Sequence, residues 1–247
     1  MKRRRFVLAT ALLAVLLCGC GASETPAPPP KDAKPENVSD NVPGKAADDG
    51  GDALPEPAEG LPDWARAYFA QVLAYESESP ASEYALIDLI DGDIPALAAG
   101  RSGYDVSLYQ YGGGVLHILM DRRAYGACGN HGYEYLPGQG VIRNYNTDLA
   151  GLVLYTSYDR VTEAWTLDSY TLALWNFDDR NGNYRMDEDE EETLGQVAFY
   201  YLDDMEITQE EYDRYAIGGD ADYAHLCGNT LCLEFLQRLN GLTAENS

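Results

Sequence analysis

Apolar residues at helical spacing open the part of the chain that the sequence predicts to fold. From Asp63 they recur every three to four positions, at Trp64, Tyr68, Phe69, Val72 and Leu73. We therefore predict an amphipathic helix that begins with Asp63 as its cap and ends at or before Pro80.

Short runs of aromatic, β-branched and alternating apolar residues follow this helix. Gly-rich and Pro/Gly turns, such as residues 111–114 and 137–140, separate several of them. The predicted strands are residues 84–90, 104–111, 114–120, 132–136, 141–146, 151–158, 163–177 and 196–202. Their close spacing favours an antiparallel meander.

Two helical signals close the chain. Thr208 and Glu211 have the spacing of a capping box, which predicts a short helix. A last helix is expected from about Thr230, with one apolar face formed by Leu231, Phe235, Leu236 and Leu239. The predicted fold is α+β: a largely antiparallel sheet with an N-terminal helix and one or two short C-terminal helices, in a single domain over residues 61–247.

The first twenty residues have the pattern of an export signal. Lys2 and three arginines precede a twelve-residue apolar stretch, residues 6–17, which is too short to span a bilayer as a helix. The sequence Leu17-Cys18-Gly19-Cys20 resembles a lipobox, which implies cleavage after Gly19 and lipidation of Cys20. An ordinary secretory signal and an uncleaved anchor helix are the alternatives. Residues 1–19 are therefore interpreted as a lipoprotein signal peptide, which predicts a lipid-anchored protein on the extracellular side of the cell membrane.

Residues 20–60 differ sharply in composition from the rest of the chain. Eight of the 12 prolines lie here and no aromatic residue does, so the segment has too little apolar surface to offset its ordering entropy. We expect a disordered tether with a reach of roughly 35 Å by random-coil scaling.

The charge of the chain limits its partners. The formal net charge is −24, and removing residues 1–19 would take away four basic residues and no acidic ones. Binding to nucleic acid phosphates requires clustered cations, so no nucleic-acid partner is expected. The predicted partners are the membrane, through the lipid on Cys20, and a cell-wall glycan or a protein ligand.

An acidic loop at residues 179–190 has the oxygen pattern of a calcium loop. Its successive ligand positions are Asp179, Asn181, Asn183, the Arg185 carbonyl, Asp187 and Glu190. Tyr184 stands where the pattern prefers glycine, and the flanks read as strands. Calcium binding and a solvated acidic hairpin tip are the two interpretations.

Several segments resemble a loosely defined group of bacterial lipoproteins from Gram-positive anaerobes that carry a domain of unknown function. The resemblance covers most of residues 61–217. It rests on the helix around Trp64, on Ile94 to Leu97 after an acidic turn, on Tyr109 and Tyr111, and on residues 144–151 and 201–212. It implies no catalytic activity. In the group the acidic turn often looks like a calcium loop, but here Ile90, Gly92 and Ala96 replace ligand positions, so residues 88–96 are interpreted as a structural turn.

The cysteines and histidines allow several interpretations. Cys128 with His131, and Cys227 with Cys232, could together form a tetrahedral zinc site. The alternatives are a Cys227–Cys232 disulfide, or reduced and buried thiols.

No sequence motif of a catalytic site is present. The chain has only three histidines, and His117 is explained by its place in a strand. Tyrosines on the strands could bind glycans, or they could simply suit half-buried strand positions. We expect a non-enzymatic binding or structural role at the cell envelope; the alternative is an envelope hydrolase that acts through paired carboxylates.

Overall fold

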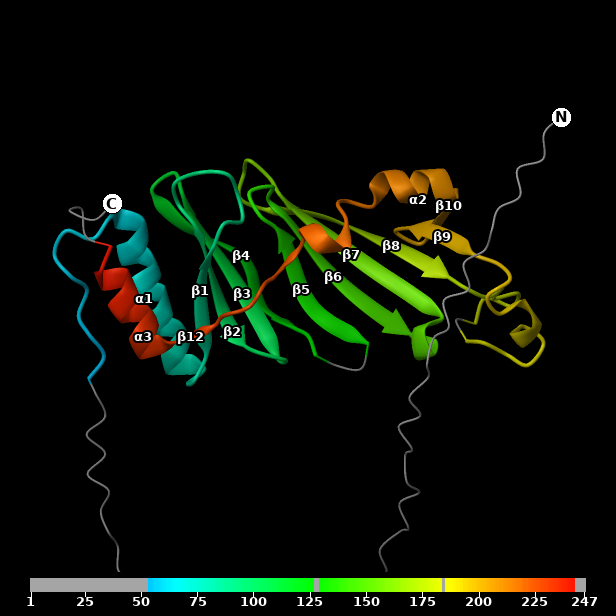
Figure 1. Cartoon of the computed structure of the whole chain (residues 1–247), viewed down its shortest axis with the longest axis horizontal. Helices are drawn as coiled ribbons and strands as arrows, with labels where there is room; N and C mark the ends of the chain where they lie inside the picture. The colour runs from blue at the N-terminus through cyan, green and yellow to red at the C-terminus, as the bar shows by residue number, and fades with distance from the viewer. Residues whose placement is uncertain (1–52, 127–128, 184, 243–247) are drawn as a thin grey trace, which may run out of the picture. The chain divides into compact units, whose positions relative to one another are not determined.

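The computed structural model describes residues 53–126, 129–183 and 185–242 (Figure 1). These belong to one compact unit, Gly51–Ser247. The predicted signal peptide, Cys20, most of the predicted tether, Cys128 and Tyr184 lie outside the described residues.

Three α-helices and twelve β-strands make up the described part of the chain, which is an α+β fold with two antiparallel sheets. The α-helices are α1 (Asp63–Glu78), α2 (Gln209–Tyr215) and α3 (Cys232–Asn240). The strands are β1 (Glu83–Ile87), β2 (Ala96–Arg101), β3 (Asp105–Gly112), β4 (Val115–Ala124), β5 (Asn130–Leu136), β6 (Val141–Asp148), β7 (Val153–Val161), β8 (Leu167–Trp175), β9 (Phe199–Leu202), β10 (Met205–Ile207), β11 (Ala224–His225) and β12 (Thr230–Leu231). Three short 3-10 helices lie at η1 (Leu149–Gly151), η2 (Glu191–Thr193) and η3 (Asp220–Asp222).

The predicted meander is confirmed, in two copies. The first sheet has the order β12-β1-β2-β3-β4, and the second has the order β10-β9-β8-β7-β6-β5-β11. In each sheet one short strand from the C-terminal part of the chain adds to the edge of an otherwise consecutive series.

Helices α1 and α3 cover one face of the first sheet (Figure 1). Tyr68 and Phe69 of α1 and Leu236 of α3 are buried against Tyr84 of β1 and Leu97 of β2. The opposite face of this sheet packs against one end of the second sheet, with Ala98, Leu108 and Met120 meeting residues that include Ile142, Val161 and Leu226.

One face of the second sheet is covered in a different way. Helix α2 and the chain after it place Tyr212, Ile217 and Tyr223 over Leu172 and Tyr158. Helix α2 does not cover the opposite face of the same strands. That face lies between the first sheet and residues 176–198.

Strand β2 was not predicted as a strand. Its sequence, ALAAGR, is rich in alanine and glycine, which have low strand propensity. The strand is buried between β1 and β3, and a Cβ on Gly100 would lie 2.2 Å from the Asp105 carbonyl oxygen. Close packing from both sides therefore selects small residues, and tertiary contacts outweigh propensity.

Two predictions about helix ends were wrong in detail. The cap position of α1 is Pro62, which makes no side-chain capping bond, and Asp63 lies in the first turn, where its charge suits the helix dipole. Leu231 is 57% exposed because it pairs with Glu83 in β12, and Cys232 is buried at the start of α3 instead. The Thr208–Glu211 capping box is confirmed.

The ordered fold also begins earlier than residue 61. Asn240 of α3 accepts a hydrogen bond from the Ala58 amide at 2.9 Å and donates one to the Glu56 carbonyl at 2.9 Å. These two bonds hold the end of the predicted tether against α3.

Candidate binding face of the second sheet

Residues from β5 to β9 form two adjacent rows across the face of the second sheet that α2 does not cover. Cross-strand pairing aligns Tyr133, Asn144, Ser157 and Thr171 in one row. The next row consists of Asn146, Tyr155, Ala173 and Tyr201. Residues in such a row point to the same side of a sheet, so the first row is mainly polar, and the second places a tyrosine on each side of a small alanine. We call this surface the binding face.

The first row lines a pocket of about 300 Å³, which we call the polar pocket. Its wall includes Arg123 at the end of β4 and Asp159 of β7. Asp159 is only 4% exposed. A buried carboxylate needs compensation, and here Arg123 Nη1 lies 2.5 Å from Asp159 Oδ2 while the Ser169 hydroxyl donates to Oδ1.

Hydroxyl and carboxylate groups continue along this pocket. Ser157 Oγ and Thr171 Oγ1 are 3.1 Å apart, and Asp203 Oδ1 accepts a hydrogen bond from the Thr171 amide at 2.8 Å. Burial raises the pKa of Tyr133, so this phenol stays protonated and can donate a hydrogen bond. The pocket thus offers donors and acceptors on one rigid strand surface.

The second row lines another pocket, of about 210 Å³, which we call the aromatic pocket. Ala173 lies between Tyr155 and Tyr201, and Trp175 lies two residues further along β8. The Trp175 and Tyr201 rings are 5.8 Å apart and inclined at 60°. Asp179, Gly182 and Asp204 complete the lining.

The hairpin between β9 and β10 places one carboxylate in the lining of each pocket. Asp203 and Asp204 form its two-residue turn, with φ of 47° and 65°. Two successive positive φ values are required by the tight hairpin turns whose twist matches the strands. Asp203 lines the polar pocket and Asp204 the aromatic pocket.

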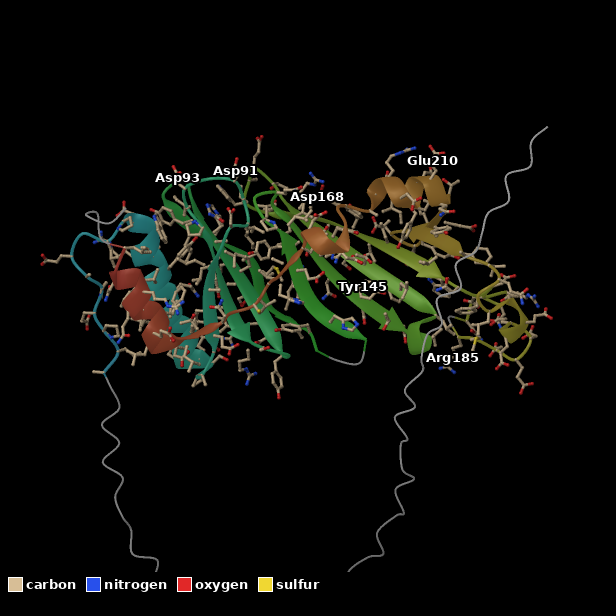
Figure 2. The ribbon with its side chains drawn as sticks, viewed as in Figure 1. Asp91, Asp93, Tyr145, Asp168, Arg185 and Glu210 are labelled. Atoms are coloured by element: carbon tan, nitrogen blue, oxygen red, sulfur yellow. The ribbon has the colours of Figure 1, made fainter. Side chains whose placement is uncertain are left out.

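The predicted calcium loop is held together by its own hydrogen bonds. Glu190 is completely buried, and its two carboxylate oxygens accept from the Arg180 and Asp187 amides at 2.8 and 3.0 Å. Asp187 Oδ2 accepts from the side-chain amides of Asn181 and Asn183, while Asp179 Oδ1 accepts from the Asn183 amide at 3.2 Å. Arg185 donates its amide to Asn183 Oδ1 at 2.7 Å and is labelled in Figure 2.

The structure brings these predicted ligands into one loop, where their side-chain oxygens accept hydrogen bonds from amides of the same loop. Within the described ranges, no group of three or more His, Cys, Asp or Glu side chains is arranged to hold a metal ion. Calcium binding by this loop stays a prediction from the sequence. The acidic turn at residues 88–96 is structural: the Asp88 carbonyl accepts from the Gly138 amide at 2.8 Å, and Ile90 pairs with Gln139.

The other chemistry-bearing residues are spread over the fold. Cys227 and Cys232 are free thiols in the structure, so the predicted disulfide is not formed there. Burial raises the pKa of both thiols, that of Cys232 to about 11, so both are protonated at neutral pH.

The histidines also belong to separate places. His117 stacks on Trp165 with ring centroids 5.3 Å apart, and His131 stacks on Tyr145, which lies on β6 (Figure 2). Cys128, the fourth proposed zinc ligand, lies outside the described residues.

Several residues of the binding face were not identified from the sequence. The tyrosines at positions 133, 155 and 201 belong to the strand tyrosines that were expected only in general terms to be able to bind glycans. Asp159, its partner Arg123, Trp175 and Asp203 carried no sequence signal, because they are brought together by the register of strands far apart in the chain.

No protein-family model, curated protein or solved structure matches this chain. Among the described residues, no helix is long and apolar enough to cross a membrane.

Proposed function

We propose that this protein is a lipoprotein anchored through Cys20 to the outer side of the cell membrane, where it has a non-enzymatic role and binds a cell-wall glycan. The observation that carries the binding role is the binding face itself. It combines hydrogen-bonding side chains and aromatic rings on one surface of five consecutive strands. The anchor is supported by the sequence of residues 1–20 alone.

A glycan suits the chemistry of this face. Sugar rings present hydroxyl groups at their edges and C–H groups on their faces. Ser157, Thr171 and Asp203 can pair with hydroxyls, and the tyrosine rings are flat apolar surfaces with a polar tip. A rigid sheet presents these groups without a large ordering cost, because its rows are set by strand pairing.

The binding proposal is tested by sedimentation of the purified protein with insoluble cell-wall glycan. We expect the parent protein to sediment with the glycan and the double variant Ser157→Ala/Thr171→Val to lose at least about tenfold in affinity, since it removes two hydroxyls from the polar pocket. Ser77→Ala removes a hydroxyl from the exposed face of α1 and should bind like the parent. Equal binding by the double variant and the parent would place the ligand elsewhere.

The anchor is tested by metabolic labelling with a fatty acid that carries an alkyne tag. The parent protein should acquire the label and stay with the membrane fraction. Cys20→Ser should abolish both, because the thioether to the diacylglyceryl group cannot form. Labelling that persists in Cys20→Ser would disprove lipidation at this residue.

A second candidate, an envelope hydrolase, has one observation in its favour: Asp159 and Asp203 line the same pocket. Glycoside hydrolysis uses two such carboxylates, one as an acid and one as a base or nucleophile. Asp159, however, is only 4% exposed, and its two oxygens are already bonded to Arg123 and Ser169, which limits its access to a substrate. Release of reducing sugar by the parent protein that is lost in both Asp159→Asn and Asp203→Asn would favour the hydrolase, and no release would favour binding alone.

A further inference from the structure

We infer that the polar pocket binds a primary ammonium group, so that the glycan proposed above is one with free amino groups, such as a polymer of glucosamine. This inference rests on the proposed glycan binding and concerns the same site. It follows from the position of Asp203, from the acceptors beside it and from the charge of the pocket.

Asp203 extends the polar row beyond Thr171. Its amide donates to the Thr171 carbonyl at 2.9 Å, and its Oδ1 accepts from the Thr171 amide at 2.8 Å. These two bonds hold the carboxylate at the end of the row, where it lines the pocket and is exposed to solvent. Within the described ranges, Asp203 Oδ2 takes part in no hydrogen bond or ion pair. One carboxylate oxygen therefore remains for a ligand.

Hydrogen-bond acceptors lie next to this carboxylate. The Ser157 and Thr171 hydroxyl oxygens are 3.1 Å apart, and one of them donates to the other. A hydroxyl oxygen has two lone pairs, so each retains at least one for a ligand. A primary ammonium group has three N–H donors and no acceptor. The carboxylate and the two hydroxyls supply the acceptors that such a group needs.

Charge favours an amine over an N-acetyl group at this site. Arg123 is the one basic residue in the described lining of the pocket, and it pairs with Asp159, so these two charges cancel. Asp203 therefore gives the pocket a net negative charge. The whole chain carries a net charge of −24, and no lysine follows Lys45. Local and long-range fields attract a cationic polymer and repel an acidic one, whereas an N-acetylated sugar is neutral and gains nothing from either field.

The inference is tested with the tetrasaccharide of glucosamine and with its fully N-acetylated form, which differ only in the acetyl groups. Calorimetric titration of the full protein at about pH 6 keeps the amines protonated, since an amine of the α-amino type has a pKa of about 7.7–8.0. We expect saturable binding, with the free-amine form bound at least about tenfold more tightly. This ratio should fall as salt is added, because salt screens exposed charges.

Two variants locate the ammonium group. Asp203→Asn removes the carboxylate and keeps the turn, since asparagine suits a positive φ. It should reduce the preference for the free-amine form to about twofold or less. Asp168→Asn makes the same charge change at an exposed residue of β8 that does not line the pocket (Figure 2). It should keep the preference of the parent protein, because the pocket itself is unchanged.

The possible results separate this inference from the glycan proposal. Equal affinity of the parent for the two tetrasaccharides would overturn the inference and leave glycan binding in place. Binding of neither tetrasaccharide by a protein that sediments with cell-wall glycan would do the same, and failure of both assays would overturn both proposals.

Two further results would also contradict the inference. The same loss of preference in Asp203→Asn and Asp168→Asn would show that net charge alone accounts for the attraction. Lysine amide that binds as tightly as the glucosamine tetrasaccharide would assign the pocket to a peptide amine instead of a sugar.

Discussion

Gly228 lies where the chain passes from β11 to β12, and its Cα faces the peptide group between Glu83 and Tyr84. A Cβ at this position would lie 2.1 Å from the Glu83 carbonyl carbon and oxygen and 2.5 Å from the Tyr84 nitrogen. These are backbone atoms of β1, which cannot move aside as a flexible side chain could. Glycine is required here by the close approach of two chain segments.

We therefore predict that Gly228→Ala lowers the free energy of unfolding by about 1–3 kcal/mol, the usual cost of overpacking. Chemical denaturation with detection by circular dichroism measures this change. Gly219→Ala is the matched control, because its Cβ would meet only Asp222 Oδ2, at an ordinary 3.4 Å. If both variants unfold at the same denaturant concentration, the close contact at Gly228 is not restrictive.

Tyr68 joins α1 to the loop before β2 and to β3 through one hydroxyl. Its OH donates to the Pro95 carbonyl at 2.7 Å and accepts from the Tyr111 amide at 3.0 Å. Burial raises the pKa of Tyr68 to about 12, although the Tyr111 bond lowers it in part. Since the folded pKa exceeds the value of about 10 in an unfolded chain, the stability from this group is complete below pH 10 and is lost as the pH rises from 10 through 12.

Tyr68→Phe should lower the free energy of unfolding at pH 7 by about 1–3 kcal/mol, because it removes both bonds from buried groups. It should also reduce the loss of stability between pH 10 and 12, since one buried phenol no longer titrates. Denaturation curves across this pH range measure both effects. Tyr104→Phe, at a 65% exposed tyrosine, is the control that should match the parent. An alkaline profile of Tyr68→Phe identical to that of the parent would argue against the raised pKa.

At the scale of elements, helix α2 depends on a titratable cap. Glu211 accepts from the Thr208 amide at 2.9 Å and from the Thr208 hydroxyl at 2.8 Å, and the amide bond is the main cause of its lowered pKa. A carboxyl with a lowered folded pKa stabilises the fold above its unfolded pKa, about 4.3. That contribution is lost as the pH falls from there through the folded value.

Hydrogen exchange of the α2 amides should therefore become faster relative to the rest of the protein as the pH falls below about 4. In Glu211→Gln this additional acid sensitivity should disappear, because the amide cannot titrate. Glu210→Gln, at an exposed residue of the same turn (Figure 2), should behave like the parent. Retained acid sensitivity in Glu211→Gln would assign it to another carboxyl.

The sequence predicts best those elements whose formation depends on residues close together in the chain. The amphipathic stretch at Trp64 and Tyr68 and the capping box at Thr208 and Glu211 depend on residues one turn apart, and both helices form. Strand β2 could not be predicted, because alanine and glycine are selected there by β1 and β3 rather than by strand propensity.

The candidate site could be predicted only in part, for a related reason. Tyr155 and Tyr201 stood out as strand tyrosines, but their shared pocket depends on Ala173, which pairs with both. Asp159 and Arg123 likewise meet only because β4 of the first sheet lies near β7 of the second. Residues 179–190 form the predicted loop because the hydrogen bonds that hold it join residues close together in the chain. The buried Glu190 accepts two of these bonds.

At the scale of the whole molecule, three links join the two sheets in addition to their shared core and the Arg123–Asp159 ion pair. The backbone of residues 88–91 is hydrogen-bonded to Gly138 and Gly140, and Ile90 pairs with Gln139. The C-terminal segment adds β11 to β5 and β12 to β1, with Leu226 buried between them (Figure 1). Trp165, in the turn between β7 and β8, reaches the first sheet as the third link.

Trp165 is fitted closely to its partners in the first sheet. It stacks on His117 of β4, and a Cβ on Gly112 of β3 would lie 2.3 Å from its ring. The residue adopts φ of 60°, which is unfavourable for a large side chain and is offset here by this contact. The link should make the two sheets unfold together.

Trp165→Ala should lower the free energy of unfolding by about 2 kcal/mol, less than for a fully buried tryptophan, and should uncouple the sheets. Trp64 on α1 and Trp175 on β8 then remain as the two tryptophans, one beside each sheet. Fluorine NMR of protein labelled with 5-fluorotryptophan resolves them. In the parent the resonances of Trp64 and Trp175 should be lost at the same denaturant concentration. In Trp165→Ala they should be lost at different concentrations. Trp165→Phe keeps an aromatic ring against His117 and should restore much of the coincidence. Loss of both resonances together in Trp165→Ala would show that the shared core, the Arg123–Asp159 pair, the bridge at Ile90 and the C-terminal segment suffice to couple the sheets.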